Sequence, residues 1–217
     1  MPRRTPIVLV VGLAVAGCAH PPAARLPVEP LVTFATHRDG DRFVLDRMRT
    51  GTTGVLDPPG RFRADYAPDF VFRADDETRA ALWVVGRSRV LIRDDASNIS
   101  RRRGEVISDW EGGAIRITLF TPDGVVLRTD PFVARDGRPL ARTPAPARGA
   151  PADDVFRATL RDAHGADVGW LRVRSPRVYD AVLPGSVDDA LAAAAAVALD
   201  IEVGWIADRD RGSEEEE

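Results

Sequence analysis

The sequence contains no lysine, so all 30 of its basic residues are arginine. We attribute this bias to GC-rich coding rather than to selection for bidentate contacts with anions. The 33 acidic residues outnumber the basic ones and give a formal net charge of −3, which argues against a general nucleic-acid-binding protein. Aromatic residues make up only 6% of the chain, too few to predict a stacking platform for single strands. We therefore predict no nucleic-acid partner.

Cysteine is almost absent as well, because Cys18 is the only one in the sequence. A disulfide framework needs an even set of cysteines, so the fold must be stabilised by a packed core. The hydrophobic fraction of 44% and the charged fraction of 29% are typical of a folded soluble domain. The chain that follows Cys18, about 200 residues, is long enough for one domain or two small ones.

The segment before Cys18 has the order of a secretory signal peptide. Arg3 and Arg4 form a positive start, and residues 7–16 form an apolar run that is too short to span a bilayer. Three residues then lead directly into the cysteine: Val15, Ala16 and Gly17. The alternative interpretation is an ordinary signal peptide in which the cysteine stands by chance.

The tetrapeptide Val15-Ala16-Gly17-Cys18 resembles the lipobox of bacterial lipoproteins. The resemblance implies that residues 1–17 are removed, that Cys18 receives a diacylglycerol, and that its new amine is acylated, for example by palmitate. Two or more acyl chains anchor a protein stably, so the implied location is the bacterial cell envelope, with the membrane as partner. Residue 19 is alanine rather than the aspartate that retains lipoproteins in the inner membrane. This favours the outer membrane if the source is Gram-negative.

Composition divides the rest of the chain into three parts. Residues 18–30 contain the lipidated cysteine and four prolines, and we predict an extended tether. Residues 31–206 are predicted to form a single globular β-rich domain, and residues 207–217 an acidic disordered tail. Within the domain, the low-complexity residues 139–154 are predicted to be a surface loop.

Two β-hairpins are predicted within the domain. The first covers residues 115–129 around the turn Thr-Pro-Asp-Gly, in which proline presets φ and glycine takes a positive φ. The second covers residues 156–174 around Asp-Ala-His-Gly. Their similarity predicts two meander hairpins in one antiparallel sheet.

A C-terminal helix is predicted over about residues 187–203, with Ser186 as its N-cap and Asp189 completing a capping box. Residues 190–199 (ALAAAAAVAL) are apolar at every position. A helix on the surface of a soluble domain would carry polar residues on one side, so we expect this one to be buried all round. Its alanines make it thin enough for a narrow enclosure.

Many short strands followed by one such helix resemble the tubby C-terminal-like superfamily, which includes the plant LURP-one-related proteins and the phospholipid scramblases. The resemblance is carried by residues 183–191 (LPGSVDDAL) and by the alanine run that ends at Asp200. It implies a closed antiparallel barrel around a central hydrophobic helix. We therefore predict a mainly β fold with one buried C-terminal α-helix, an antiparallel β-barrel-like sheet wrapped around that helix. The alternative is a two-layer α+β meander with the helix on one face.

The sequence shows no local catalytic or metal-binding motif. His20, His37 and His164 have no second histidine or cysteine at ligand spacing, and no nucleophile elbow, zinc-protease motif, P-loop or dinucleotide fingerprint occurs. We predict no metal, no cofactor and no enzymatic activity. Catalysis by residues distant in sequence stays open, so an envelope hydrolase is kept as an alternative function.

One segment is rich in arginine and could contact anionic lipid headgroups. Its members are Arg87, Arg89, Arg93, Arg101, Arg102 and Arg103. The alternative is a set of solvated strand faces whose charge is neutralised by neighbouring carboxylates.

These observations predict a membrane-anchored envelope lipoprotein that acts as a non-catalytic binding or scaffold module. The alternative is a phospholipid-interacting module of the tubby-like type, whose partner would be an anionic lipid. Another envelope component is the remaining candidate partner.

Overall fold

The computed structural model describes residues 30–48, 53–58, 67–75, 77–86, 88–94, 101–140, 155–175 and 177–212, with the side chains of the C-terminal helix described as far as Val203. Cys18 and the lipobox residues Val15, Ala16 and Gly17 lie outside this part of the chain. The elements are β1 (Leu31–Asp39), β2 (Arg42–Arg47), β3 (Thr53–Asp57), β4 (Phe70–Ala74), β5 (Glu77–Val85), β6 (Arg89–Arg93), β7 (Arg102–Glu111), β8 (Ala114–Phe120), β9 (Val126–Thr129), β10 (Val133–Ala134), β11 (Phe156–Arg161), β12 (Asp167–Ser175), β13 (Val178–Pro184) and α1 (Asp189–Gly212).

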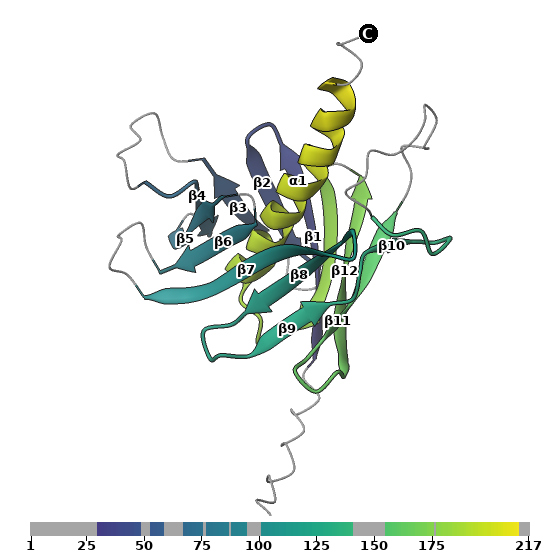
Figure 1. Ribbon diagram of the computed structural model, residues 1–217. Helices are drawn as coiled ribbons and strands as arrows, with labels where there is room; N and C mark the ends of the chain where they lie inside the picture. The colour runs from purple at the N-terminus through teal and green to yellow at the C-terminus, as the bar shows by residue number, and fades with distance from the viewer. Residues whose placement is uncertain are drawn as a thin grey trace, which may run out of the picture.

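The strands form a closed antiparallel barrel of 12 strands (Figure 1). From β1 to β9 each strand pairs with the next in the chain, and β11, β12 and β13 continue the sheet back to β1. The ring closes between β9 and β11, through the pairs Leu160↔Thr129 and Arg161↔Arg128. The short β10 pairs with β11 beside this closure. The predicted fold class is confirmed, and the open two-layer alternative is wrong.

The two predicted hairpins lie on either side of the closure, as β8–β9 and β11–β12. Their loops use the same hydrogen bonds: Thr121 N donates to Val125 O, and Asp162 N donates to Ala166 O, each at 3.0 Å. The glycine of each loop has a positive φ, 80° at Gly124 and 79° at Gly165, which explains why both turn sequences end in glycine.

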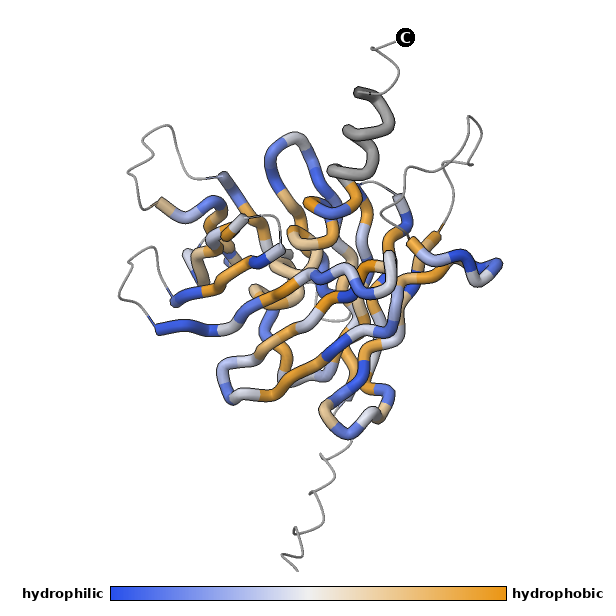
Figure 2. The backbone as a smooth tube through the Cα atoms, in the orientation of Figure 1, coloured by the Kyte–Doolittle hydropathy of each residue, from blue (hydrophilic) through white to orange (hydrophobic). Residues whose placement is uncertain are grey.

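The barrel encloses a continuous hydrophobic core. Inward positions alternate with polar outward ones, as in β2, where Phe43 and Leu45 are buried while Arg42 and Asp46 are exposed. Figure 2 shows this alternation along the strands, with hydrophilic residues at many of the turns. One correction to the sequence analysis concerns Leu140. It was placed in the surface loop 139–154, but it is buried, and its N–H donates to Phe132 O at 2.7 Å.

The helix α1 runs through the barrel and fills its interior (Figure 1). Every residue from 190 to 199 is at most 4% exposed, as the all-apolar run predicts. The helix packs most closely against β6 and β7. Close packing is possible there because residue 104 is glycine: a Cβ would lie 2.9 Å from Phe120 O and 3.3 Å from Leu191 Cδ1.

The ends of α1 differ from the prediction. The N-cap is Asp188 rather than Ser186, since Asp188 Oδ1 accepts a hydrogen bond from Ala190 N at 2.7 Å. Val187, which lies between these two residues, is buried. The turn before the helix therefore places a hydrophobic side chain in the core. The helical backbone continues to Gly212, past the expected end near residue 203, and no proline interrupts the sequence in this stretch.

Candidate functional site

Two acidic residues near the end of the apolar run attach α1 to the barrel wall. Asp200 Oδ1 accepts a hydrogen bond from the Tyr179 hydroxyl at 2.7 Å, and Asp200 Oδ2 accepts one from Arg38 Nη1 at 2.7 Å. Burial, together with the nearby Asp200 carboxylate, raises the pKa of Tyr179 far above its ordinary value. Tyr179 is therefore a permanent hydrogen-bond donor to the helix.

The second acidic residue, Glu202, binds the opposite side of the helix to β7. Its carboxylate accepts hydrogen bonds from the Ser108 hydroxyl at 2.6 Å and from Trp110 Nε1 at 2.8 Å. Glu202 is 6% exposed, so both of its oxygens are satisfied by the barrel rather than by water. We call the end of the barrel marked by Asp200 the exit end. At the entry end, Asp189 pairs with Arg47 at 3.6 Å.

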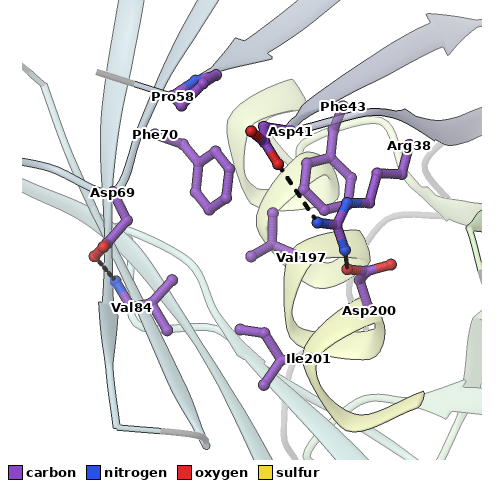
Figure 3. Close-up of a pocket in the computed structure, with 10 residues that line it drawn as sticks. All are labelled: Arg38, Asp41, Phe43, Pro58, Asp69, Phe70, Val84, Val197, Asp200 and Ile201. Carbon is purple, nitrogen blue, oxygen red and sulfur yellow. Dashed lines mark hydrogen bonds and ion pairs between the residues drawn. The ribbon is translucent and has the colours of Figure 1, made fainter. Parts of the chain in front are cut away.

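A groove of about 390 Å³ opens beside α1 at the exit end (Figure 3). Its lining comes from the end of β1, the starts of β2 and β4, the ends of β3 and β5, and the helix. Six lining residues are apolar and four are charged: Phe43, Pro58, Phe70, Val84, Val197 and Ile201, with Arg38, Asp41, Asp69 and Asp200. This volume is within the range of small-molecule sites, which begins at about 300 Å³.

The walls of the groove are ordered by specific contacts. Phe43 and Phe70 pack edge to face, with ring centroids 5.6 Å apart and planes at 82°. The Arg38 guanidinium lies 5.8 Å from the centre of the Phe43 ring. On the other side, Asp69 Oδ2 accepts a hydrogen bond from Val84 N at 2.7 Å, which joins the start of β4 to the end of β5. The groove is thus preformed.

The groove and the start of the domain lie at opposite ends of the barrel. Pro30 O lies near Gly185, just before α1 begins. The groove is instead lined by Val197, Asp200 and Ile201, near the other end of the buried helical run. Figure 1 shows α1 leaving the barrel at the exit end.

Three arginines of the arginine-rich segment form ion pairs within the protein. Arg89 and Arg102 both pair with the buried carboxylate of Glu105. Arg103 pairs with Asp188 and, at 3.6 Å, with Asp94. These contacts give three of the six predicted lipid-contact residues partners within the protein.

Of the other three arginines, Arg93 is the register partner of Arg102, because β6 pairs with β7. The Arg93 guanidinium lies 5.7 Å from the Trp83 ring centre, a cation–π contact. Arg101 is exposed where β7 begins, and its carbonyl oxygen accepts a hydrogen bond from Asp94 N. Arg87 lies outside the described residues.

The histidines show no ligand geometry. His37 is exposed on β1, and His164 is a turn residue whose N–H donates to Asp162 Oδ1 at 2.9 Å. Within the part of the chain that the structure describes, no group of three metal-ligating side chains occurs, and no helix combines the length and apolarity needed to cross a membrane. His20 lies outside that part.

The groove is not predicted from the sequence, because its residues are distributed over five strand ends and one helix and no local pattern marks them. Of these residues, only Asp200 enters the sequence-based predictions by name, as the end of the alanine run. An acidic residue directly after a fully buried apolar run was the available signal, because a buried carboxylate needs donors from neighbouring elements.

No known protein family matches the chain, and no curated protein matches it.

Proposed function

We propose that this protein is a lipid-anchored binding module of the bacterial envelope, non-catalytic, with the groove at the exit end as its ligand site. The observation that carries the proposal is the position of the groove. It is a preformed, mainly apolar cavity at the end of the barrel opposite to Pro30. A chain held through Cys18 and a proline-rich tether would present this end away from the membrane, toward ligands in the aqueous compartment.

The chemistry of the lining supports binding rather than reaction. Among the described lining residues there are carboxylates and one guanidinium, but no serine, cysteine or histidine that could act as a nucleophile with its base. The interior behind the groove is filled by α1, which leaves little room for a deep polar pocket. An envelope hydrolase is therefore the less favoured alternative.

A titration with a neutral probe tests the ligand site. We expect 4-phenylbutanol, added to the full chain carrying Cys18→Ala, to shift the methyl resonances of Val84, Val197 and Ile201 saturably. Ile201→Trp should abolish the shifts of Val84 and Val197 by filling the groove. If the shifts do not saturate, or if those of Val84 and Val197 survive in Ile201→Trp, the groove is not a ligand site.

Fractionation tests the anchor. Wild-type protein should stay with the membrane after a high-salt wash, whereas Cys18→Ala should be released, because the acyl chains supply the attachment. Ala19→Ser serves as the matched control and should stay bound. Membrane attachment of Cys18→Ala after the wash would contradict the lipoprotein assignment.

The second candidate is a phospholipid-interacting module of the tubby-like type. A closed barrel of 12 strands around an apolar helix is the architecture that this resemblance implies, and this supports the candidate. The ion pairs of Arg89, Arg102 and Arg103 weaken it, since their charge is already balanced. Co-sedimentation of the Cys18→Ala chain with anionic vesicles at low salt tests it, because screening is smallest there. Absence of binding would remove the candidate.

A further inference from the structure

The ion pair beside the groove already has its partners within the protein. Arg38 Nη1 donates to Asp200 Oδ2 at 2.7 Å, and Arg38 Nε donates to Gly40 O at 2.8 Å. The other oxygen of Asp200 accepts a hydrogen bond from the Tyr179 hydroxyl at 2.7 Å. A ligand that bound to this pair would replace hydrogen bonds that the protein makes by itself, so it would gain little free energy there.

The other two acidic residues of the lining also have partners or water. Asp69 Oδ2 accepts a hydrogen bond from Val84 N at 2.7 Å, and Asp69 has a further interaction within the protein. Asp41 lies 3.9 Å from Arg38, and its side chain is 87% exposed, so water hydrates it at the rim. Among the described lining residues, no buried side-chain nitrogen or oxygen is left without a hydrogen-bond partner. Such unpaired groups are what makes a site select a polar ligand.

The interior of the groove is a hydrocarbon surface. Val197 and Phe43 are 1% and 3% exposed, and Val84 and Ile201 are partly buried against the core. Figure 3 shows Val197 and Ile201 in the middle of the groove, with charged side chains on either side of them. A ligand that enters the groove therefore gains free energy by removing its own apolar surface, and that of these residues, from water.

The aliphatic residues of the lining are better placed for this contact than the two rings. Phe43 and Phe70 pack edge to face on each other, and the Arg38 guanidinium lies 5.8 Å from the centre of the Phe43 ring. The protein thus occupies part of the ring surface that an aromatic ligand would need for stacking. The aliphatic lining residues are Pro58, Val84, Val197 and Ile201.

We propose that the groove binds the hydrocarbon chain of a small amphiphile and recognises it by apolar contact. This inference rests on the proposed function, because it names the ligand class of the same site. A cavity of about 390 Å³ is in the lower part of the range of small-molecule sites. We therefore expect the site to take one short chain rather than the two chains of a diacyl lipid.

A series of neutral alcohols tests this ligand class. Titration of the full Cys18→Ala chain, followed through the methyl resonances of Val84 and Val197, compares 1-butanol, 1-hexanol and 1-octanol. The affinity should rise about threefold to fourfold with each added methylene, because the burial of one methylene contributes about 0.8 kcal/mol. Diethylene glycol monoethyl ether has the length of 1-octanol but carries two ether oxygens within its chain, and it should bind at least about tenfold more weakly. Cys18→Ala removes the proposed acylation site, so no acyl chain of the protein itself competes.

Two neighbouring valines of β5 assign the binding to the groove. Val84→Thr replaces a methyl group of the lining with a hydroxyl group of similar size, and threonine suits a strand as well as valine does. We expect this variant to bind 1-octanol at least about threefold more weakly, measured through Val197. Val85 is 45% exposed and does not line the groove, so Val85→Thr makes the same chemical change and should leave the affinity unchanged.

The outcomes separate this inference from the proposed function. If 4-phenylbutanol binds but the affinity of the alcohols does not rise with chain length, or if the ether binds as tightly as 1-octanol, the hydrocarbon-chain assignment is overturned while the ligand site stands. If neither 4-phenylbutanol nor any of the alcohols gives saturable shifts, both fail. Equal affinities of Val84→Thr and Val85→Thr for 1-octanol would also overturn the assignment to the aliphatic wall.

Discussion

Arg103 and Asp188 are 85 residues apart in the sequence, and the Arg103 guanidinium donates to the carboxylate that caps α1. The same side chain of Asp188 thus fixes the first turn of the helix and attaches it to the start of β7. Arg103, which the sequence offers as a possible lipid contact, thus helps to position the central helix in the folded protein.

We expect Asp188→Ala to lower the free energy of unfolding by about 2 kcal/mol, because it removes a cap worth about 1 kcal/mol and leaves the partly buried Arg103 with only the longer contact to Asp94. Chemical denaturation followed by circular dichroism measures the change. Asp188→Ser restores the cap but not the ion pair and should recover part of the loss. A cost for Asp188→Ala no larger than that for Asp123→Ala at an exposed turn would contradict this role.

The alanines of α1 are needed for their small size. Ala194 is fully buried, so Ala194→Leu forces extra atoms between the helix and the strands and should cost about 1–3 kcal/mol. Thermal unfolding provides the measurement. Ala163→Leu in the exposed β11–β12 loop makes the same chemical change and should stay within about 0.5 kcal/mol of wild type. Equal stabilities of the two variants would show that the lumen is not tightly filled.

Two variants of Glu202 distinguish the contribution of its hydrogen bonds to stability from that of its negative charge. Glu202→Ala leaves the Ser108 hydroxyl and Trp110 Nε1 without their acceptors, and we expect a loss of about 2–4 kcal/mol, since each buried unsatisfied group costs about 1–3 kcal/mol. Glu202→Gln keeps one acceptor oxygen and can donate to Ser108, so its cost should be less than half as large. Denaturant titration distinguishes the two variants, and a loss as large in Glu202→Gln as in Glu202→Ala would mean that the negative charge itself is required.

Asp180 makes the free energy of unfolding depend on pH in the acid range. Burial alone would raise the pKa of this carboxyl, but hydrogen bonds and charge from Arg174 and Arg172 outweigh burial and lower it. A pKa that is lower in the folded state than in the unfolded state means that the stabilisation is present above about pH 4 and is lost as the pH falls through the folded value.

Wild-type stability should therefore fall on acidification from pH 5 toward pH 2, and Asp180→Asn should be less stable by about 2 kcal/mol at pH 7. The difference in the free energy of unfolding between wild type and Asp180→Asn should become smaller as the pH decreases. Urea titrations at several pH values measure this difference. Asp123→Asn should run parallel to wild type. A constant gap at all pH values would show that Asp180 does not titrate with a lowered pKa.

The elements that the sequence predicts are those with local causes. The glycine-ended turns after residues 120 and 161 predict the two hairpins, and a run of ten apolar residues predicts a helix surrounded by strands. The N-cap was misplaced because Ser186 and Asp188 both have capping side chains, and the choice between them depends on Val187 packing into the core.

The groove and the ion-pair partners of the arginines could not be predicted in the same way. Arg38 meets Asp200 across 162 positions, because the closed barrel brings β1 beside the end of the helix. Glu105 receives Arg89 only because β6 pairs with β7, whereas Arg102 is three residues before Glu105 in the same strand. Strand register places Arg89 beside Glu105, and register depends on the sheet as a whole rather than on any short segment.

The helix that fills the barrel comes after every strand in the chain, and this order has a consequence for biosynthesis. A nascent polypeptide that has emerged only as far as β13 contains every strand of the barrel but not the helix that fills it. The inward side chains of the strands therefore stay in contact with water. Completion of the core waits for the last segment, and translation products that stop before Asp189 should be recognised by proteases as unfolded. Until that segment emerges, the strands lack the side chains that fill the barrel, so the domain should not reach its stable folded state.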